Sequence, residues 1–347
     1  MNRDKAVGIW LGIGVVMIFF QIFIGGVTRL TGSGLSITKW EIVTGTLPPL
    51  SEDHWEEEFE EYKATPQYHK INKGMSLGDF KFIYFWEYFH RLWARSMGFV
   101  FLFPLLYFLW KKKIRKALKP HLAGVFALAA LVASFGWIMV ASGLIERPWV
   151  NAYKLSIHLS LGILLYAYVL YLAYDELFAK KKEASRQIYK WSVLLSSALA
   201  IQIFLGGLMS GMKAGLFFPT WPDMNGAIIP ETLLDFSNLT LSAFTHYDSN
   251  IYAVAFVQFF HRLLAYIIVI FALLFWKKIK DSNIPSIQTA KQLLVFAVLL
   301  QVTLGIITVV MCKGQIPVFW GVAHQAGAIF LLSVLLYILY CTKPGKS

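Results

Sequence analysis

Four histidines stand inside long apolar stretches of the chain, at His90, His158, His261 and His324. An imidazole in hydrocarbon needs a partner, and ionisable groups inside a membrane are candidates for function by default. A single buried histidine more often makes a hydrogen bond between helices than binds a ligand, but four at one depth favour ligation. Two neutral imidazoles from facing helices of a bundle can bind haem iron from both sides. Closed zinc and copper sites use more ligands, so we predict haem.

One carboxylate lies beside only one of these histidines. The tetrapeptide FHRL occurs at 89–92 and again at 260–263, so the position of Glu87 corresponds to Gln258. Glu87 precedes His90 by three residues, which places both on one helix face. An acid at one haem and a neutral amide at the other predict that one site does chemistry, with Glu87 catalytic, while the other holds a cofactor. The alternative is that Glu87 only orients His90 or Lys81.

An arginine follows each histidine of the repeated tetrapeptide. We expect the planar guanidinium groups of Arg91 and Arg262 to pair with haem propionates, because this fork matches a carboxylate. The alternative is that both side chains extend to the outer membrane interface without binding a ligand.

Membrane-spanning helices must hold these residues. The chain has 347 residues, of which 57% are hydrophobic and 15% charged, and this balance indicates a lipid environment. A crossing of the bilayer needs about 20 apolar residues. The sequence offers eight such stretches and so predicts an all-α integral membrane protein, with spans near 7–28, 83–110, 122–144, 153–174, 190–211, 251–276, 290–312 and 318–341.

The two halves of the chain resemble each other. QIFIGG at 21–26 matches QIFLGG at 202–207, and Gly136 and His158 pair with Gly305 and His324. Each half holds four spans, so both copies enter the membrane in the same direction, as two four-helix bundles related by a pseudo-two-fold axis along the membrane normal. We predict an N-terminal half, 1–185, with a long outer loop at 29–82. The C-terminal half, 186–347, has its outer loop at 212–250.

Lysines cluster in three short connections, which start at Lys111, Lys180 and Lys277. The positive-inside rule places these connections and both termini in the cytoplasm. The net charge of +12 therefore reports topology, and we expect the lipid bilayer and no nucleic acid as a partner. Met1 to Trp10 has neither a cleavage site nor an organellar transit pattern, which favours a bacterial inner membrane. In the first outer loop, Ser51 and the acidic residues after it predict a capped surface helix.

Several segments resemble the haem A synthase family, in the branch shared by mitochondria and several bacterial groups. The similarity runs from the first span to the eighth and rests on SGLSITKWEIVTGTLPPLSEDHW (33–55), FWEYFHRL (85–92), RPWVNAYKLSIHL (147–159), AGLFFPTWPDMNG (214–226), FFHRL (259–263) and HQAGA (324–328). The resemblance implies an eight-helix enzyme that oxidises the C8 methyl group of farnesylated haem O to the formyl group of haem A, through a hydroxymethyl intermediate. Some bacterial members carry a cysteine pair in an outer loop, which both outer loops of this chain lack.

The resemblance also assigns roles to the residues above. His90 and His158, with Arg91, would bind the substrate haem in the N-terminal half. His261 and His324, with Arg262, would bind a resident haem b in the C-terminal half, and Glu87 would be the catalytic acid. Haem O synthase and terminal oxidase assembly factors are then candidate partners; the sequence names no electron acceptor.

Two other functions fit four intramembrane histidines. A b-type electron-transfer subunit with two haems, oxidising quinol, would hold both haems permanently and unmodified. A transporter would need a site at the membrane midplane with broken helices, whereas the polar groups noted here all lie in the outer third of the membrane.

Overall fold

The computed structural model describes residues 3–39, 47–144, 147–178 and 183–344. In these ranges it has eight helices long and apolar enough to cross a membrane, and no strand. They are α1 (Lys5–Leu30), α4 (Leu77–Trp110), α5 (Lys119–Ala141), α6 (Ala152–Leu177), α7 (Arg186–Gly211), α9 (Ile251–Ile279), α10 (Gln288–Val310) and α11 (Val318–Thr342). Each predicted span is confirmed, and α4 begins six residues before the predicted start of its span, at residue 83.

Side-chain caps set where several of these helices begin. Asp4 accepts a hydrogen bond from the backbone N–H of Ala6 at the start of α1, and Asn151 and Asn250 cap α6 and α9 in the same way. Ser76 and Asp79 form a reciprocal capping box on α4. Such caps satisfy backbone donors that the first helical turn leaves unpaired, which matters most where lipid replaces water.

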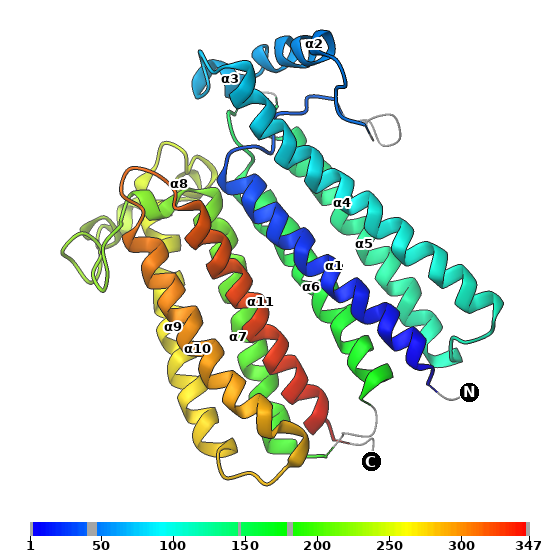
Figure 1. Ribbon diagram of the computed structural model, residues 1–347. Coiled ribbons are helices and arrows are strands. Elements are labelled where there is room, and N and C mark those ends of the chain that lie inside the picture. Colours follow the sequence, from blue (N-terminus) through cyan, green and yellow to red (C-terminus); the bar gives the residue numbers. More distant parts are fainter. Residues whose placement is uncertain (1–2, 40–46, 145–146, 179–182, 345–347) are drawn as a thin grey trace.

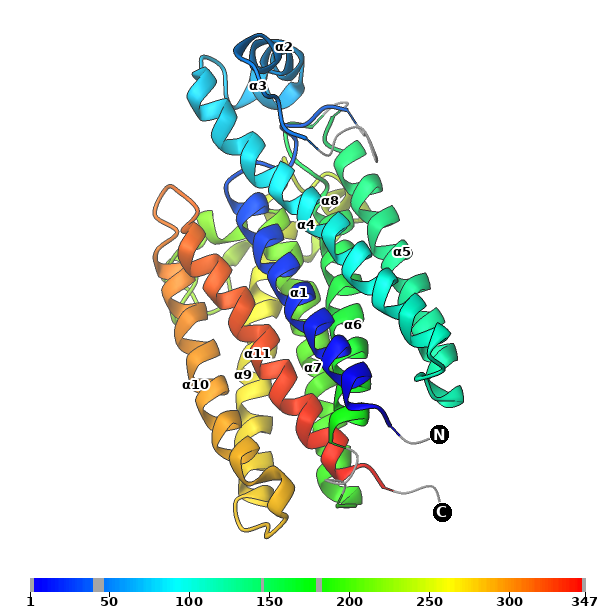
Figure 2. The same ribbon diagram turned by 45° about the vertical axis from the view of Figure 1, so that its right-hand side comes forward.

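The helices form two groups of four (Figures 1 and 2). In each group two helices lie at the centre of the molecule and two on its flank: α1 and α6 with α4 and α5, and α7 and α11 with α9 and α10. The central helices α1, α6, α7 and α11 pack against one another across the boundary. This arrangement is consistent with the predicted pseudo-two-fold. Both termini lie at one end, called here the inner end, and α2 and α3 lie at the opposite, outer end (Figure 1).

The first outer loop folds into a small cap on α4. Its two helices are α2 (Glu52–Lys63), capped by Ser51 as predicted, and α3 (Pro66–Lys70). The aromatic rings of Phe59 and Tyr62 pack on Phe80 of α4. The C-terminal counterpart has 3-10 turns and the short α8 (Leu241–Thr245). Three internal segments lie outside the described residues: 40–46 of the first outer loop, 145–146 between α5 and α6, and 179–182, which include the start of the second lysine cluster.

Candidate functional site

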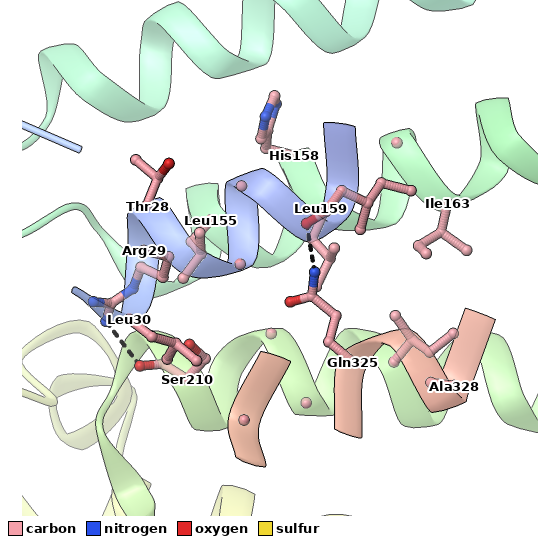
Figure 3. A pocket seen from close by; sticks show the side chains of 18 of the residues that line it. Thr28, Arg29, Leu30, Leu155, His158, Leu159, Ile163, Ser210, Gln325 and Ala328 are labelled. Atoms are coloured by element: carbon pink, nitrogen blue, oxygen red, sulfur yellow. Dashed lines mark hydrogen bonds between the residues drawn. The ribbon is translucent and has the colours of Figure 1, made fainter. Parts of the chain in front are cut away.

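A cavity of about 1260 Å³ lies between the helices and is lined by all four intramembrane histidines, with Glu87, Arg91 and Arg262. Its volume exceeds the range of about 300–1,000 Å³ that is usual for drug-sized ligands. Its wall includes residues of both helix groups, among them Arg29 and Gln325 (Figure 3). The structure therefore brings all the predicted site residues to one continuous cavity.

Each histidine faces a glycine of a neighbouring helix. A methyl group added to the glycine would lie close to the imidazole Cε1, so the missing side chain makes the room that the ring occupies. The distance from the added methyl to Cε1 would be 3.0 Å for Gly25 and His90, 2.9 Å for Gly136 and His158, 3.4 Å for Gly206 and His261, and 2.9 Å for Gly305 and His324. Because the pattern recurs in both helix groups, these glycines set the positions of the histidines as well as the approach of the helices.

The imidazoles also meet polar groups of their neighbours. His158 Nδ1 is 3.0 Å from the backbone oxygen of Val132 on α5, a bond that fixes the ring and leaves Nε2 as the free acceptor. In the two FHRL segments a glutamine amide contacts the other ring nitrogen, Nε2. The amide of Gln21 donates to His90 Nε2 at 3.0 Å, and the amide of Gln202 donates to His261 Nε2 at 3.2 Å.

These donors fit haem iron. Nδ1 of His261 and Nδ1 of His324 are buried and have no hydrogen-bond partner, an arrangement that is costly unless another group satisfies it. The side chains are neutral nitrogen ligands in an apolar cavity, which suits axial ligation of haem. Within the described ranges, no cluster of three or more His, Cys, Asp or Glu side chains could hold a metal ion directly.

Glu87 is buried and held on both carboxylate oxygens. Oε2 accepts from the backbone N–H of Ser36 at 2.7 Å, from the Ser36 hydroxyl at 2.8 Å and from the backbone N–H of Ile37 at 3.0 Å. Oε1 accepts from Arg91 Nη2 at 2.6 Å. The side chains of Arg91 and Glu87 are only 13% and 4% exposed, so this ion pair is desolvated. The geometry fixes the orientation of the carboxylate.

The equivalent place in the C-terminal half keeps the scaffold without the acid. Gln258 donates its amide N–H to the backbone oxygen of Phe218 at 2.8 Å. Arg262 donates to the same oxygen at 2.9 Å and to the backbone oxygen of Asp223 at 2.6 Å. Arg91 likewise donates to backbone oxygens, those of Ile37 and Lys39. Both arginines thus tie an outer loop to a helix, a role that the sequence did not predict; their pairing with propionates stays a prediction.

Side chains of the cavity wall make hydrogen bonds between the two helix groups (Figure 3). Arg29 of α1 donates to the backbone oxygen of Ser210 on α7 at 2.8 Å. Gln325 of α11 donates to the backbone oxygen of Ile22 on α1 at 2.7 Å. Since Gln325 follows His324 directly, the backbone of one group contacts the histidine helix of the other.

Comparison with known proteins agrees with this geometry. The family model described as cytochrome oxidase assembly protein matches residues 8–336. The heme A synthase of Nitrosospira multiformis is 40% identical over 342 residues, covering 96% of this chain and 93% of the relative. The heme A synthase of Flavobacterium psychrophilum is 38% identical over 344 residues, covering 98% of this chain and 99% of the relative. The chain belongs to the haem A synthase family.

Other features of this haem A synthase family member lie away from the cavity. His54, His69 and His246 are exposed on the outer loops, and His121 Nδ1 is 2.8 Å from the hydroxyl of Tyr168 at the inner end of α5. These four histidines therefore lie on loops or at a helix end, outside the membrane-spanning site. Sequence reasoning missed Ser36, although the comparison of the two halves held a signal. The ungapped match pairs Ser36 with Phe217, so this hydroxyl, like the Glu87 carboxylate that Gln258 replaces, occurs only in the N-terminal half.

Proposed function

We propose that the chain is a haem A synthase, which oxidises the C8 methyl group of haem O to the formyl group of haem A through a hydroxymethyl intermediate. The observation that carries this proposal is the buried Glu87 carboxylate beside the histidine-lined cavity, with the neutral Gln258 at the equivalent place. A pure electron-transfer subunit has no need for a desolvated acid at only one of two haems. The names of the relatives point to the same activity.

The two halves take different haems in this proposal. His90 and His158 bind the iron of haem O, the substrate, and His261 and His324 bind a resident haem b. Haem iron supplies the redox chemistry that side chains lack. The glycines opposite the four imidazoles keep the rings in the cavity wall, and Arg91 and Arg262 lie at its outer end, where propionates of each haem would meet them.

Glu87 acts on the carbon that is oxidised. As electrons leave the methyl group, positive charge develops there, and a fixed carboxylate in a water-poor site stabilises it or takes up the proton that is released. Ser36 and Ile37 present three donors to Oε2, so the carboxylate is oriented before the substrate binds. Preorganisation of this kind needs no rearrangement during the reaction.

We propose a bacterial inner-membrane location with both termini in the cytoplasm. The connections that hold the lysines after Trp110 and after Trp276 lie at the same end as both termini, which supports this orientation. Haem O synthase would deliver the substrate, and terminal oxidase assembly factors would receive the product.

Pigment analysis tests the function. Purified wild-type protein supplied with haem O should yield haem A, and Glu87→Gln should bind haem O without converting it. Haem extracted from His261→Ala and His324→Ala should lack haem b. Wild-type protein that holds haem B at both sites and never converts haem O would overturn the proposal in favour of the electron-transfer subunit.

A further inference from the structure

The N-terminal helix group is open on one flank. α1 packs on α4, and α5 packs on α6, but within the described residues the backbones of α4 and α5 make scarcely any contact, whereas α9 and α10 do pack together. The aromatic rings of Phe101 and Phe126 meet between α4 and α5, with centroids 5.3 Å apart. Phe101 lies three turns from His90 towards the inner end, about 16 Å at 1.5 Å per residue. The opening is therefore confined to the outer part of this flank.

The equivalent flank of the C-terminal group carries larger side chains at the matched positions. The FHRL match pairs Gly98 of α4 with Val269 of α9, and the pairing of Gly136 with Gly305 places Ala129 and Ala133 of α5 opposite Val298 and Val302 of α10. The structure supports this register, because Gly136 and Gly305 have the same distances to their histidines. All six of these flank residues line the cavity. A methyl group added at Gly98 would meet no atom within 4 Å.

Among the described residues, three other sides of the N-terminal site are packed against protein. The Glu87 bonds to Ser36 and Ile37 tie the outer loop across the outer end. α1 and α6 pack closely along the centre, and the apolar core fills the inner end. Apart from the continuation of the cavity towards the C-terminal helix group, the least packed direction for a longer ligand runs between α4 and α5 into the lipid.

We propose that the outer part of the α4–α5 flank is a lateral portal, through which the isoprenoid tail of the substrate haem lies in the bilayer. This inference rests on the proposed function, which makes a farnesylated haem the substrate. A farnesyl chain in lipid avoids water at no packing cost to the protein. Haem b has no such chain, which agrees with the valines at the C-terminal flank. The small residues of the portal thus select a tailed haem for one half of the chain.

The test replaces the portal residues by their C-terminal counterparts. Two variants are compared with wild type: the triple variant Gly98→Val, Ala129→Val, Ala133→Val and the single variant Ala133→Val. Each protein is titrated with haem O and with haem B, which carries no tail. Binding is followed by the Soret difference spectrum. We expect the triple variant to bind haem O at least ten-fold more weakly than wild type, with haem B affinity changed less than two-fold. Retained haem B binding also shows that the variant folds.

Three results are decisive. Haem O affinity that is unchanged in the triple variant rejects the portal, and conversion of haem O by wild type in the same preparation leaves the proposed function standing. Equal loss of haem O and haem B affinity also rejects the portal, because it places the valines against the macrocycle. If wild-type protein binds haem O but never oxidises it, the proposed function is rejected. The portal is then still tested by the change in haem O affinity relative to haem B affinity in the triple variant.

Discussion

Replacing Glu87 by glutamine separates the chemistry of the acid from its structural role. The C-terminal half shows how an amide is accommodated at this place, since Gln258 donates to a loop carbonyl that Arg262 also contacts. Removing one partner of a buried ion pair costs about 3–5 kcal/mol. Arg91 keeps the backbone oxygens of Ile37 and Lys39. We therefore expect a smaller loss of stability, about 1–3 kcal/mol, and a folded protein that binds haem.

The expected loss of activity is larger. A positioned proton acceptor or charge contributes about 10²- to 10⁴-fold, which corresponds to about 2.7–5.5 kcal/mol of barrier. The assay is haem O turnover by chromatography, with the unfolding temperature measured in parallel. The matched control is Glu176→Gln, which breaks the buried pair with Arg115 (2.5 Å) at the inner end of α6. The control should lose stability and keep its turnover; near-normal turnover of Glu87→Gln would refute the role of the carboxylate.

Three further predictions follow from the site and the outer cap. Ser36→Ala removes the hydroxyl donor 2.8 Å from Glu87 Oε2, and the loss of about 1–2 kcal/mol of oriented hydrogen bonding should lower turnover about ten-fold. The control Ser33→Ala removes a buried hydroxyl that is bonded to Thr31 and should leave turnover unchanged. Equal effects of the two substitutions on turnover would count against a specific role of Ser36. Gly136→Ala and Gly305→Ala place a methyl 2.9 Å from an imidazole and should each abolish the haem spectrum of one half, whereas Gly12→Ala, with open space around it, should retain both spectra. Burial raises the pKa of Tyr62 in the outer cap to about 12. Because this folded-state pKa lies above the ordinary value near 10, the contribution of Tyr62 to the stability of the cap is fully present below pH 10. The cap should lose about 2–3 kcal/mol of folding free energy between about pH 10 and 12. Proteolysis of the α2–α3 segment should therefore speed up over that range in wild type and less in Tyr62→Phe, and a flat wild-type profile would contradict this account.

The sequence was sufficient for the elements and for finding residues that lie together on one cavity. Eight apolar stretches predicted eight spanning helices, and a serine before an acidic run predicted the start of α2. Four histidines predicted two pairs of haem ligands, one pair in each half, and the structure places all four on one cavity; their ligation stays a prediction. These features depend on length, composition and local caps, which a single segment already contains.

Contacts between segments could not be predicted in the same way. Spanning helices are apolar on every side, so their patterns do not show which face meets a neighbour. The repeated motif shows that its glycines are matched between the halves, but their position opposite the imidazoles depends on the three-dimensional register. The bonds from Ser36 and Ile37 to Glu87 depend on a loop that folds back over the helix end, and local turn residues do not determine that path.

The bond from Gln325 to the backbone of Ile22 occurs once, because the equivalent of Gln325 after His158 is Leu159, which has no amide to donate. In a dimer of identical half-length chains, two-fold symmetry would impose every such contact twice or not at all. Joining the halves in one polypeptide removes that constraint, so a substitution can serve one site without altering the other.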